Sequence, residues 1–279
     1  MKVVLITGTS SGIGLEVAAQ AAATGWRTVA TMRDPGADGP LRQAVLASGA
    51  SSLLEVRQLD VTDDASVDAC VAGVVADHGR IDAVVNNAGR GHVGTMELDS
   101  LEDVRQVMEV NFFGAVRVAK AAFVHLRAAQ DGRLVSVSSV GGAVGNPFNE
   151  AYCAAKFALE GYMEALAPVA ASVGVKVSVI EPGAVSSEFV SNLGLDPASL
   201  TSRAGVYAPA MTAYVKSVMA RFGRAQSPRE AAAAVVETLT LPEPPLRLQT
   251  SDDAEELVAT KLADLNGAKV MGMTRSWIS

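Results

Sequence analysis

The first two dozen residues constrain the fold most strongly. Residues 3–6 read VVLI, a short continuous apolar run that is typical of a strand buried on both faces of a parallel sheet. The turn TGTSSGIG follows at residues 7–14, and a helical stretch continues over residues 15–23. A strand, a glycine-rich turn and a helix in this order open a dinucleotide-binding fold, in which backbone N–H groups at the helix start face phosphates.

The three glycines of this turn have distinct roles in that interpretation. Gly8 permits the tight turn, Gly12 lets the backbone approach a pyrophosphate, and Gly14 lets helix and strand pack closely. Their spacing is G-x3-G-x-G and not the commoner G-x-G-x-x-G. A plain tight turn is therefore the alternative, and the rest of the chain has to decide.

Apolar runs that predict further strands recur along the chain, with helical stretches between them. This alternation with short turns predicts an α/β fold built on a doubly wound, Rossmann-like parallel sheet of seven strands. Nothing suggests a second domain, so we expect a single domain over residues 1–279, with a helical substrate lid at about 188–225 and a C-terminal helix and tail at 251–279. The other strands are expected at residues 27–32, 53–59, 81–85, 134–137, 175–180 and 246–250.

Charge and composition exclude several classes of function. A net charge of −7 without a Lys or Arg run argues against nucleic acid or an anionic membrane as a partner. Two cysteines make no disulfide framework, and no pair of the three histidines has metal-ligand spacing, so we expect free thiols and no metal. No apolar run approaches the ~20 residues of a membrane span and no signal peptide is evident, which favours a cytoplasmic protein.

The stretch from Ser139 to Lys156 indicates a reaction. Tyr152 and Lys156 have the i, i+4 spacing of one helix face. If a strand ends near Ser139 and a helix starts near Tyr152, the two hydroxyls converge on one substrate oxygen. An ammonium nearby lowers the pKa of a phenol, so Tyr152 can exchange a proton with a carbonyl or alcohol oxygen that Ser139 holds. For Ser139, Tyr152 and Lys156 taken alone, the alternative is that they occur at these spacings by chance.

The glycine turn resembles the TGxxxGIG motif of the classical short-chain dehydrogenases/reductases. The segments ATMRD, NPFNEAYCAAKFALEG and PLRLQT further resemble the branch of 17β-hydroxysteroid dehydrogenase type 1 and the retinol dehydrogenases. The resemblance covers roughly the first 190 residues in family order. After the glycine turn it continues through Asp60-Val61, Asn86-Asn87-Ala88-Gly89, Asn111, Ser139, Tyr152, Lys156 and Pro182-Gly183.

This resemblance implies a catalytic tetrad and a set of cofactor contacts. It adds Asn111 to Tyr152, Lys156 and Ser139, as the residue that holds a water linking the lysine to solvent. Asn111 falls inside the helical stretch 101–129, where we expect a local irregularity, and a satisfied helix asparagine is the alternative. The implied cofactor contacts are Gly8, Ser10, Ser11, Gly12, Ile13, Gly14, Arg33, Asp60, Val61, Asn87, Ala88, Gly89, Tyr152, Lys156, Pro182, Gly183, Val185 and Ser187.

Three of these positions carry further expectations. By resemblance, Asp60 bonds the adenine amine, with capping of the next helix as the alternative. Ser187 replaces the family's threonine, so the hydroxyl that bonds the carboxamide is kept. Where NAD-selective members have an acidic residue, this chain has Met32 and then Arg33, and a guanidinium suits a 2′-phosphate. We therefore expect NADP(H) as the preferred cofactor and NAD(H) as the alternative. The competing interpretation of Arg33 is an exposed loop arginine without a role in cofactor binding.

The sequence predicts an enzyme that interconverts a ketone or aldehyde with an alcohol on an apolar substrate of steroid, retinoid or polyketide type. A 3-oxoacyl thioester reductase and a non-catalytic NADP(H)-binding regulator are the alternatives. By resemblance, the helices near 103–129 and 152–172 pair between subunits, so we expect a homodimer or homotetramer. The expected substrate contacts are Ser139, Val140, Asn146, Asn149 and Phe189.

Overall fold

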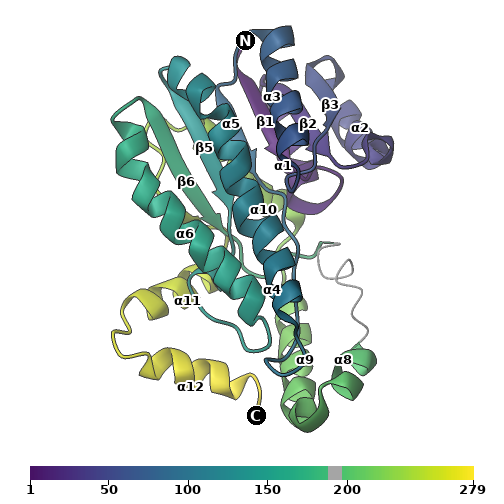
Figure 1. The fold of residues 1–279 in the computed structure, drawn as a ribbon, viewed down its shortest axis with the longest axis vertical. Coiled ribbons are helices and arrows are strands. Elements are labelled where there is room, and N and C mark those ends of the chain that lie inside the picture. Colours follow the sequence, from purple (N-terminus) through teal and green to yellow (C-terminus); the bar gives the residue numbers. More distant parts are fainter. Residues whose placement is uncertain (188–196) are drawn as a thin grey trace.

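The computed structural model describes residues 1–187 and 197–279. Its centre is one parallel sheet in the order β3-β2-β1-β4-β5-β6-β7, which confirms the seven-stranded, doubly wound arrangement (Figure 1). Because β1 pairs with both β2 and β4, the strand order reverses there, and ligands of such sheets bind beyond the strand ends at the reversal. The strands are β1 Val3–Thr7, β2 Arg27–Met32, β3 Leu54–Gln58, β4 Ala83–Asn86, β5 Gly132–Val137, β6 Val175–Glu181 and β7 Arg247–Gln249.

Helices cover both faces of the sheet, because alternate residues of each strand point to opposite faces. In β1, Val4 and Ile6 join the core beneath α1, α2 and α10, whereas Val3 and Leu5 join the core beneath α3, α5 and α6. The two layers make a single domain. These helices are α1 Gly12–Ala23, α2 Gly39–Ala47, α10 Pro228–Thr240, α3 Asp64–His78, α5 Gly114–Ala128 and α6 Glu150–Ala171.

The helical stretch 101–129 contains the irregularity that the sequence predicts. Helix α4, Leu101–Met108, passes into a π-helical turn at Glu109–Phe113, and α5 follows directly. Asn111 is buried within this turn. A π-helical turn inside a helix is often found at a functional site, because it re-aims the side chains that it carries.

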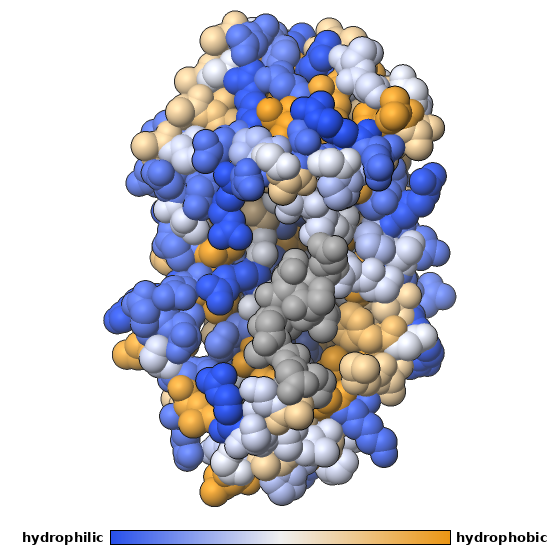
Figure 2. Space-filling view, turned by 90° about the vertical axis from the view of Figure 1, so that its right-hand side faces the viewer, coloured by the Kyte–Doolittle hydropathy of each residue, from blue (hydrophilic) through white to orange (hydrophobic). Residues whose placement is uncertain are grey.

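The remaining helices gather at the carboxyl ends of the strands (Figure 1). They are α8 Pro197–Arg203, α9 Ala208–Phe222, α11 Asp252–Leu262 and α12 Ala268–Ser276, so the C-terminal part holds two helices where we expected one. The space-filling view shows hydrophilic and hydrophobic residues interspersed on the side that it presents (Figure 2). None of the helices in the described ranges is long and apolar enough to cross a bilayer. Short 3-10 turns occur at Pro35–Ala37, Ser51–Leu53, Val140–Gly142 and Gly205–Tyr207.

Candidate active site

A cavity of about 1770 Å³ opens at the carboxyl ends of the strands and brings most of the predicted residues together. Of the predicted site residues, Asn111 does not line this cavity, and Phe189 lies outside the described residues. Those that line it are Gly8, Ser10, Ser11, Gly12, Ile13, Gly14, Arg33, Asp60, Val61, Asn87, Ala88, Gly89, Ser139, Val140, Asn146, Asn149, Tyr152, Lys156, Pro182, Gly183, Val185 and Ser187.

Thr7 and Asn87 hold the glycine turn against the loop that follows β4. The Thr7 hydroxyl accepts hydrogen bonds from the backbone N–H groups of Asn87 and Ala88, each at 3.0 Å. The Asn87 amide donates to the backbone oxygens of Thr7 and Gly8, each at 2.9 Å. We did not predict a role for Thr7, although its place directly before Gly8 was an available signal.

The two ends of the glycine turn require glycine for different reasons. Gly8 has a φ of +70°, which side chains other than glycine rarely adopt. A Cβ at Gly14 would lie 2.3 Å from both the Asn87 amide nitrogen and the Gly8 oxygen. Gly14 therefore allows a close approach, but to the turn itself and to the Asn87 side chain and not to the strand as we predicted.

The described residues fit a dinucleotide with an additional phosphate. No acidic residue lies in the first turn of α1, and Ser11 makes no side-chain capping bond there, so the positive end of the helix is open to an anion. At the end of β2, Met32 is buried, and the exposed Arg33 lines the cavity. The charged side chain of the strand end that lines the cavity is therefore a guanidinium, whereas the carboxylate of the next residue, Asp34, accepts a bond from the Gly36 N–H at 2.9 Å.

Asp60 is engaged in its own turn and does not cap the following helix. Its carboxylate accepts hydrogen bonds from the backbone N–H of Thr62 at 2.9 Å and from the Thr62 hydroxyl at 2.8 Å. These bonds lower the pKa of Asp60, and the nearby charge of Arg33 adds to the effect. The cap of α3 is Asp63, so the alternative that we gave for Asp60 is wrong.

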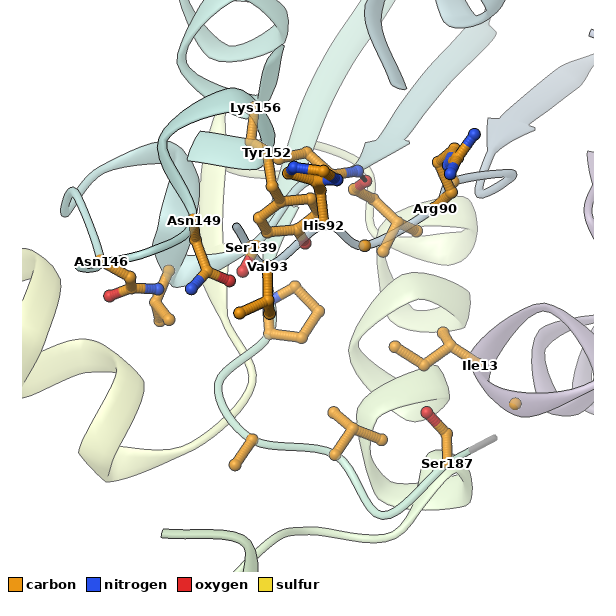
Figure 3. Close-up of a pocket in the computed structure, with 18 of the residues that line it drawn as sticks. Ile13, Arg90, His92, Val93, Ser139, Asn146, Asn149, Tyr152, Lys156 and Ser187 are labelled. Atoms are coloured by element: carbon orange, nitrogen blue, oxygen red, sulfur yellow. Dashed lines mark hydrogen bonds between the residues drawn. The ribbon is translucent and has the colours of Figure 1, made fainter. Parts of the chain in front are cut away.

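Ser139, Tyr152 and Lys156 meet where β5 ends and α6 begins (Figure 3). The hydroxyls of Ser139 and Tyr152 are hydrogen-bonded to each other, as their predicted convergence requires. Ser139 also accepts a bond from the backbone N–H of Gly141 at 3.0 Å, which fixes its side chain. Lys156 is buried, donates to the Val137 oxygen at 2.9 Å, and places its Nζ 5.9 Å from the centre of the Tyr152 ring.

Burial shifts the pKa values of Tyr152 and Lys156. It raises the pKa of Tyr152 to about 12, although the bond to Ser139 acts in the opposite direction. It lowers the pKa of Lys156 to about 8. The predicted lowering of the tyrosine pKa is therefore reversed in the structure. At neutral pH, Tyr152 is a protonated phenol beside an ammonium, which is the form that gives a proton to a carbonyl oxygen.

Asn111 lies beside the lysine but is fully engaged with the backbone. Its amide donates to the Arg90 oxygen at 2.8 Å and to the Val107 oxygen at 2.9 Å, and its Oδ1 accepts from the Arg90 N–H at 3.2 Å. A Cβ on Gly89 would lie 2.9 Å from Asn111 Oδ1 and 3.7 Å from Lys156 Nζ. Asn111 therefore fixes the loop after β4 and has the bonding of the satisfied asparagine that we gave as the alternative.

The substrate end of the cavity combines polar groups with an apolar wall. Asn149 donates to the Pro147 oxygen at 2.9 Å and to the Tyr214 hydroxyl at 2.5 Å, so its amide is committed to a neighbouring helix, α9. Asn146 points into the cavity beside Gly141 (Figure 3). His92 also lines the cavity and pairs with Asp99 at 2.9 Å. Sequence spacing did not reveal the contact between Asn149 and Tyr214, because 65 residues separate them.

Comparison with known proteins identifies the family. Residues 2–198 match the family described as short chain dehydrogenase. Retinol dehydrogenase 8 from Bos taurus is 39% identical over 280 residues, which cover 96% of this chain and 87% of that protein. 17-beta-hydroxysteroid dehydrogenase type 1 from Mus musculus is 38% identical, with 95% of this chain and 78% of that protein covered. The chain therefore belongs to the short-chain dehydrogenase family, and the predicted branch is confirmed.

Solved structures of the family agree with this assignment. A short-chain dehydrogenase from Streptomyces avermitilis has a TM-score of 0.77 at 32% identity and covers 99% of this chain, with 95% of its own chain covered. An alcohol dehydrogenase from the archaeon Thermococcus sibiricus, complexed with 5-hydroxy-NADP, has a TM-score of 0.72 at 25% identity, with 89% and 95% covered. Among the residues described, no three His, Cys, Asp or Glu side chains form a group that could hold a metal ion.

Proposed function

We propose that the protein is an NADP(H)-dependent oxidoreductase that interconverts a ketone or aldehyde with an alcohol on an apolar substrate. The observation that carries the proposal is the hydrogen-bonded pair of Ser139 and Tyr152 above the buried Lys156, in the same cavity as the glycine turn. A proton donor, a cation and an open helix start in one cavity are the parts that carbonyl reduction by a dinucleotide needs.

The bound cofactor supplies the hydride, and the chain supplies the proton and the electrostatics. Tyr152 gives its proton to the carbonyl oxygen, and Ser139 donates a hydrogen bond to the same oxygen as negative charge develops on it. Lys156 stabilises the phenolate that remains, because its ammonium lies beneath the ring. In the oxidation of an alcohol, Tyr152 takes the proton, so the same groups serve both directions. We expect reduction to dominate in cells, where NADPH pools are kept reduced.

Arg33 supports NADP(H) as the preferred cofactor, with NAD(H) as the weaker alternative. Its guanidinium follows the buried Met32 at the end of β2 and faces the cavity without a carboxylate in the acidic position of NAD-selective relatives. Arginine recognises a phosphate by charge and by paired N–H donors. The structural relative complexed with 5-hydroxy-NADP supports the same choice.

The lining of the cavity supports an apolar substrate. The similar proteins named as a retinol dehydrogenase and a 17-beta-hydroxysteroid dehydrogenase point to the same class of compound. The segment 188–225 is proposed as the lid, since its described helix α9 forms much of this wall and moving it would admit or release substrate. The apolar residues on the substrate side include Val93, Leu200, Met211, Val215, Val218 and Phe222.

Exposed aromatic and aliphatic residues support a homodimer or homotetramer. Phe113 on the π-helical turn and Phe157, Tyr162 and Val169 on α6 all leave a large part of their side chains in solvent. The rings of Phe112 and Tyr162 stack edge to face with their centroids 5.9 Å apart. They continue this surface from the π-helical turn to α6. Exposed apolar patches of this kind are typical of subunit interfaces, and sedimentation equilibrium tests the proposal.

The test is the oxidation of NADPH and NADH by the purified protein, followed by absorbance across a panel of carbonyl compounds. The panel contains a steroid ketone, retinal, an aliphatic diketone and a 3-oxoacyl thioester, which represents the alternative reductase. We expect turnover of an apolar carbonyl with NADPH. Arg33→Ala should lower the preference for NADPH over NADH at least tenfold, whereas the exposed Arg127→Ala should not change it. An unchanged preference in Arg33→Ala would refute the role of Arg33.

A further inference from the structure

A buried acidic pair lies directly behind the catalytic residues. Glu160 on α6 is 6% exposed, and Glu181, the last residue of β6, is fully buried. Arg247 of β7 reaches both carboxylates, with its Nε 3.4 Å from Glu160 and 3.6 Å from Glu181. Arg247 also pairs with the half-exposed Glu164, and Gln249 donates to Glu181. The reaction proposed above uses none of these groups.

Partners satisfy the two buried carboxylates unequally. The Glu160 carboxylate is hydrogen-bonded by the Ser138 side chain, whereas Glu181 Oε1 makes no hydrogen bond within the described part of the chain and has Arg247 Nε at 3.6 Å. Burial, together with the charge of Glu181, raises the pKa of Glu160 to about 7. A fold that needed only packing here would be better served by apolar side chains, since burying carboxylates without full pairing is costly.

The acidic pair balances the charge of the catalytic lysine. Glu160 lies one helical turn after Lys156, so the two side chains share a face of α6. The described residues place no carboxylate within 4.0 Å of Lys156, whose Nζ binds the Val137 oxygen. Glu160 is the acid whose charge raises the pKa of Lys156 against the effect of burial. When all are ionised, Lys156 and Arg247 carry as much positive charge as Glu160 and Glu181 carry negative charge.

We propose that Glu160 is a positioning residue for the reaction, because its carboxylate, fixed by Arg247, keeps the ammonium of Lys156 protonated behind Tyr152. The inference rests on the proposed function only for its effect on catalysis. The ionisable groups around Glu160 are Lys156 and Glu164 on its own helix, Glu181 on β6 and Arg247 on β7.

The ionisation of Glu160 favours the charged form of Lys156. As the pH rises through about 7, Glu160 loses its proton and gains its full negative charge. Lys156 loses its own proton near pH 8, so Glu160 carries most of its negative charge over the range in which the lysine titrates. Glu160 therefore extends the pH range over which Lys156 remains an ammonium.

The direct test is an NMR titration of the Lys156 side chain, which reads protonation without any turnover. The variants are Glu160→Gln, which removes the charge and keeps the shape, and Glu164→Gln, a control that also contacts Arg247 but lies on the exposed side. We expect the Lys156 pKa to fall by about one unit in Glu160→Gln. It should remain near 8 in Glu164→Gln. Glu160→Asp, which keeps the charge, should restore most of the wild-type value.

Activity and stability separate this role from a structural one. If the proposed function holds, the alkaline limb of kcat/KM for reduction should move to lower pH by the same amount in Glu160→Gln. Thermal unfolding at pH 8 should show that the variant is folded, because Arg247 keeps its pairs with Glu164 and Glu181. An unchanged Lys156 pKa in Glu160→Gln would overturn the inference, whatever the activity. Absence of turnover in the wild type with a shifted Lys156 pKa would overturn only the proposed function.

Discussion

Replacing Lys156 with methionine should make the protein more stable at neutral pH while abolishing its activity. Lys156 is 4% exposed, and burial lowers its pKa from 10.5 to about 8. That difference corresponds to about 3 kcal/mol that the folded state loses by keeping the lysine charged. Methionine fills similar volume, but it leaves the Val137 oxygen without its donor at a cost of about 1 kcal/mol. The net gain expected at pH 7 is about 2 kcal/mol.

The gain in stability of Lys156→Met over the wild type should disappear at high pH, which identifies burial of the lysine charge as its cause. At pH 7 the lysine is charged in both the folded and the unfolded wild type. Between pH 8 and 10.5 the folded lysine is neutral while the unfolded lysine is still protonated, so the unfolded state binds more protons. Wild-type stability therefore rises with pH across this window relative to Lys156→Met. Near pH 10 the variant should be no more stable than the wild type.

Urea unfolding at pH 7 and pH 10 measures both quantities, with the exposed Lys216→Met as the control. The control should change the unfolding free energy by less than about 0.5 kcal/mol at either pH. A loss of stability in Lys156→Met at pH 7, or a gain that does not depend on pH, would refute the reasoning that burial of the charge is the dominant effect.

Four further substitutions test other parts of the structure. Gly14→Ala should weaken NADPH binding at least tenfold and lower stability, because its Cβ would lie 2.3 Å from fixed atoms, whereas Gly161→Ala in α6 meets nothing within 4 Å and should stabilise by about 0.5–1 kcal/mol. Fluorescence titration and thermal unfolding measure the two effects. Asn111→Ala removes three hydrogen bonds and should lower the urea unfolding free energy by about 3 kcal/mol. Ser227→Ala removes the capping box of α10 and should cost about 1 kcal/mol in the same assay.

Local patterns were sufficient for the fold, and the family resemblance supplied much of the site. The run of residues 3–6 and the glycines after it have few structural alternatives, and the observed turn follows from them. The break at Asn111 was also readable, because it depends on neighbours within a few residues. Asn146 and Asn149 were correctly placed at the cavity because they lie on the loop between Ser139 and Tyr152.

Features that depend on packing depth or on distant partners were not readable from the sequence. The pKa of Tyr152 moves upward because the surrounding chain buries it, and spacing to Lys156 does not reveal that burial. Asn149 binds Tyr214 of α9, far along the chain. The pairing of Glu160 with Arg247 needs α6 and β7 to be neighbours, although its position one turn after Lys156 was a signal that we did not use.

The most direct test of the central claim compares the wild type with Tyr152→Phe for transfer of deuterium from labelled NADPH to a carbonyl substrate. Binding of NADPH, measured on the same samples, should be similar in both proteins. We predict that the wild type forms a labelled alcohol and that Tyr152→Phe does so about 10²–10⁴-fold more slowly, because it lacks the proton donor. Equal rates in the two proteins would contradict the assignment of Tyr152. If the wild type binds NADPH tightly but transfers deuterium to no carbonyl compound, the result would instead favour the alternative of a non-catalytic NADP(H)-binding regulator.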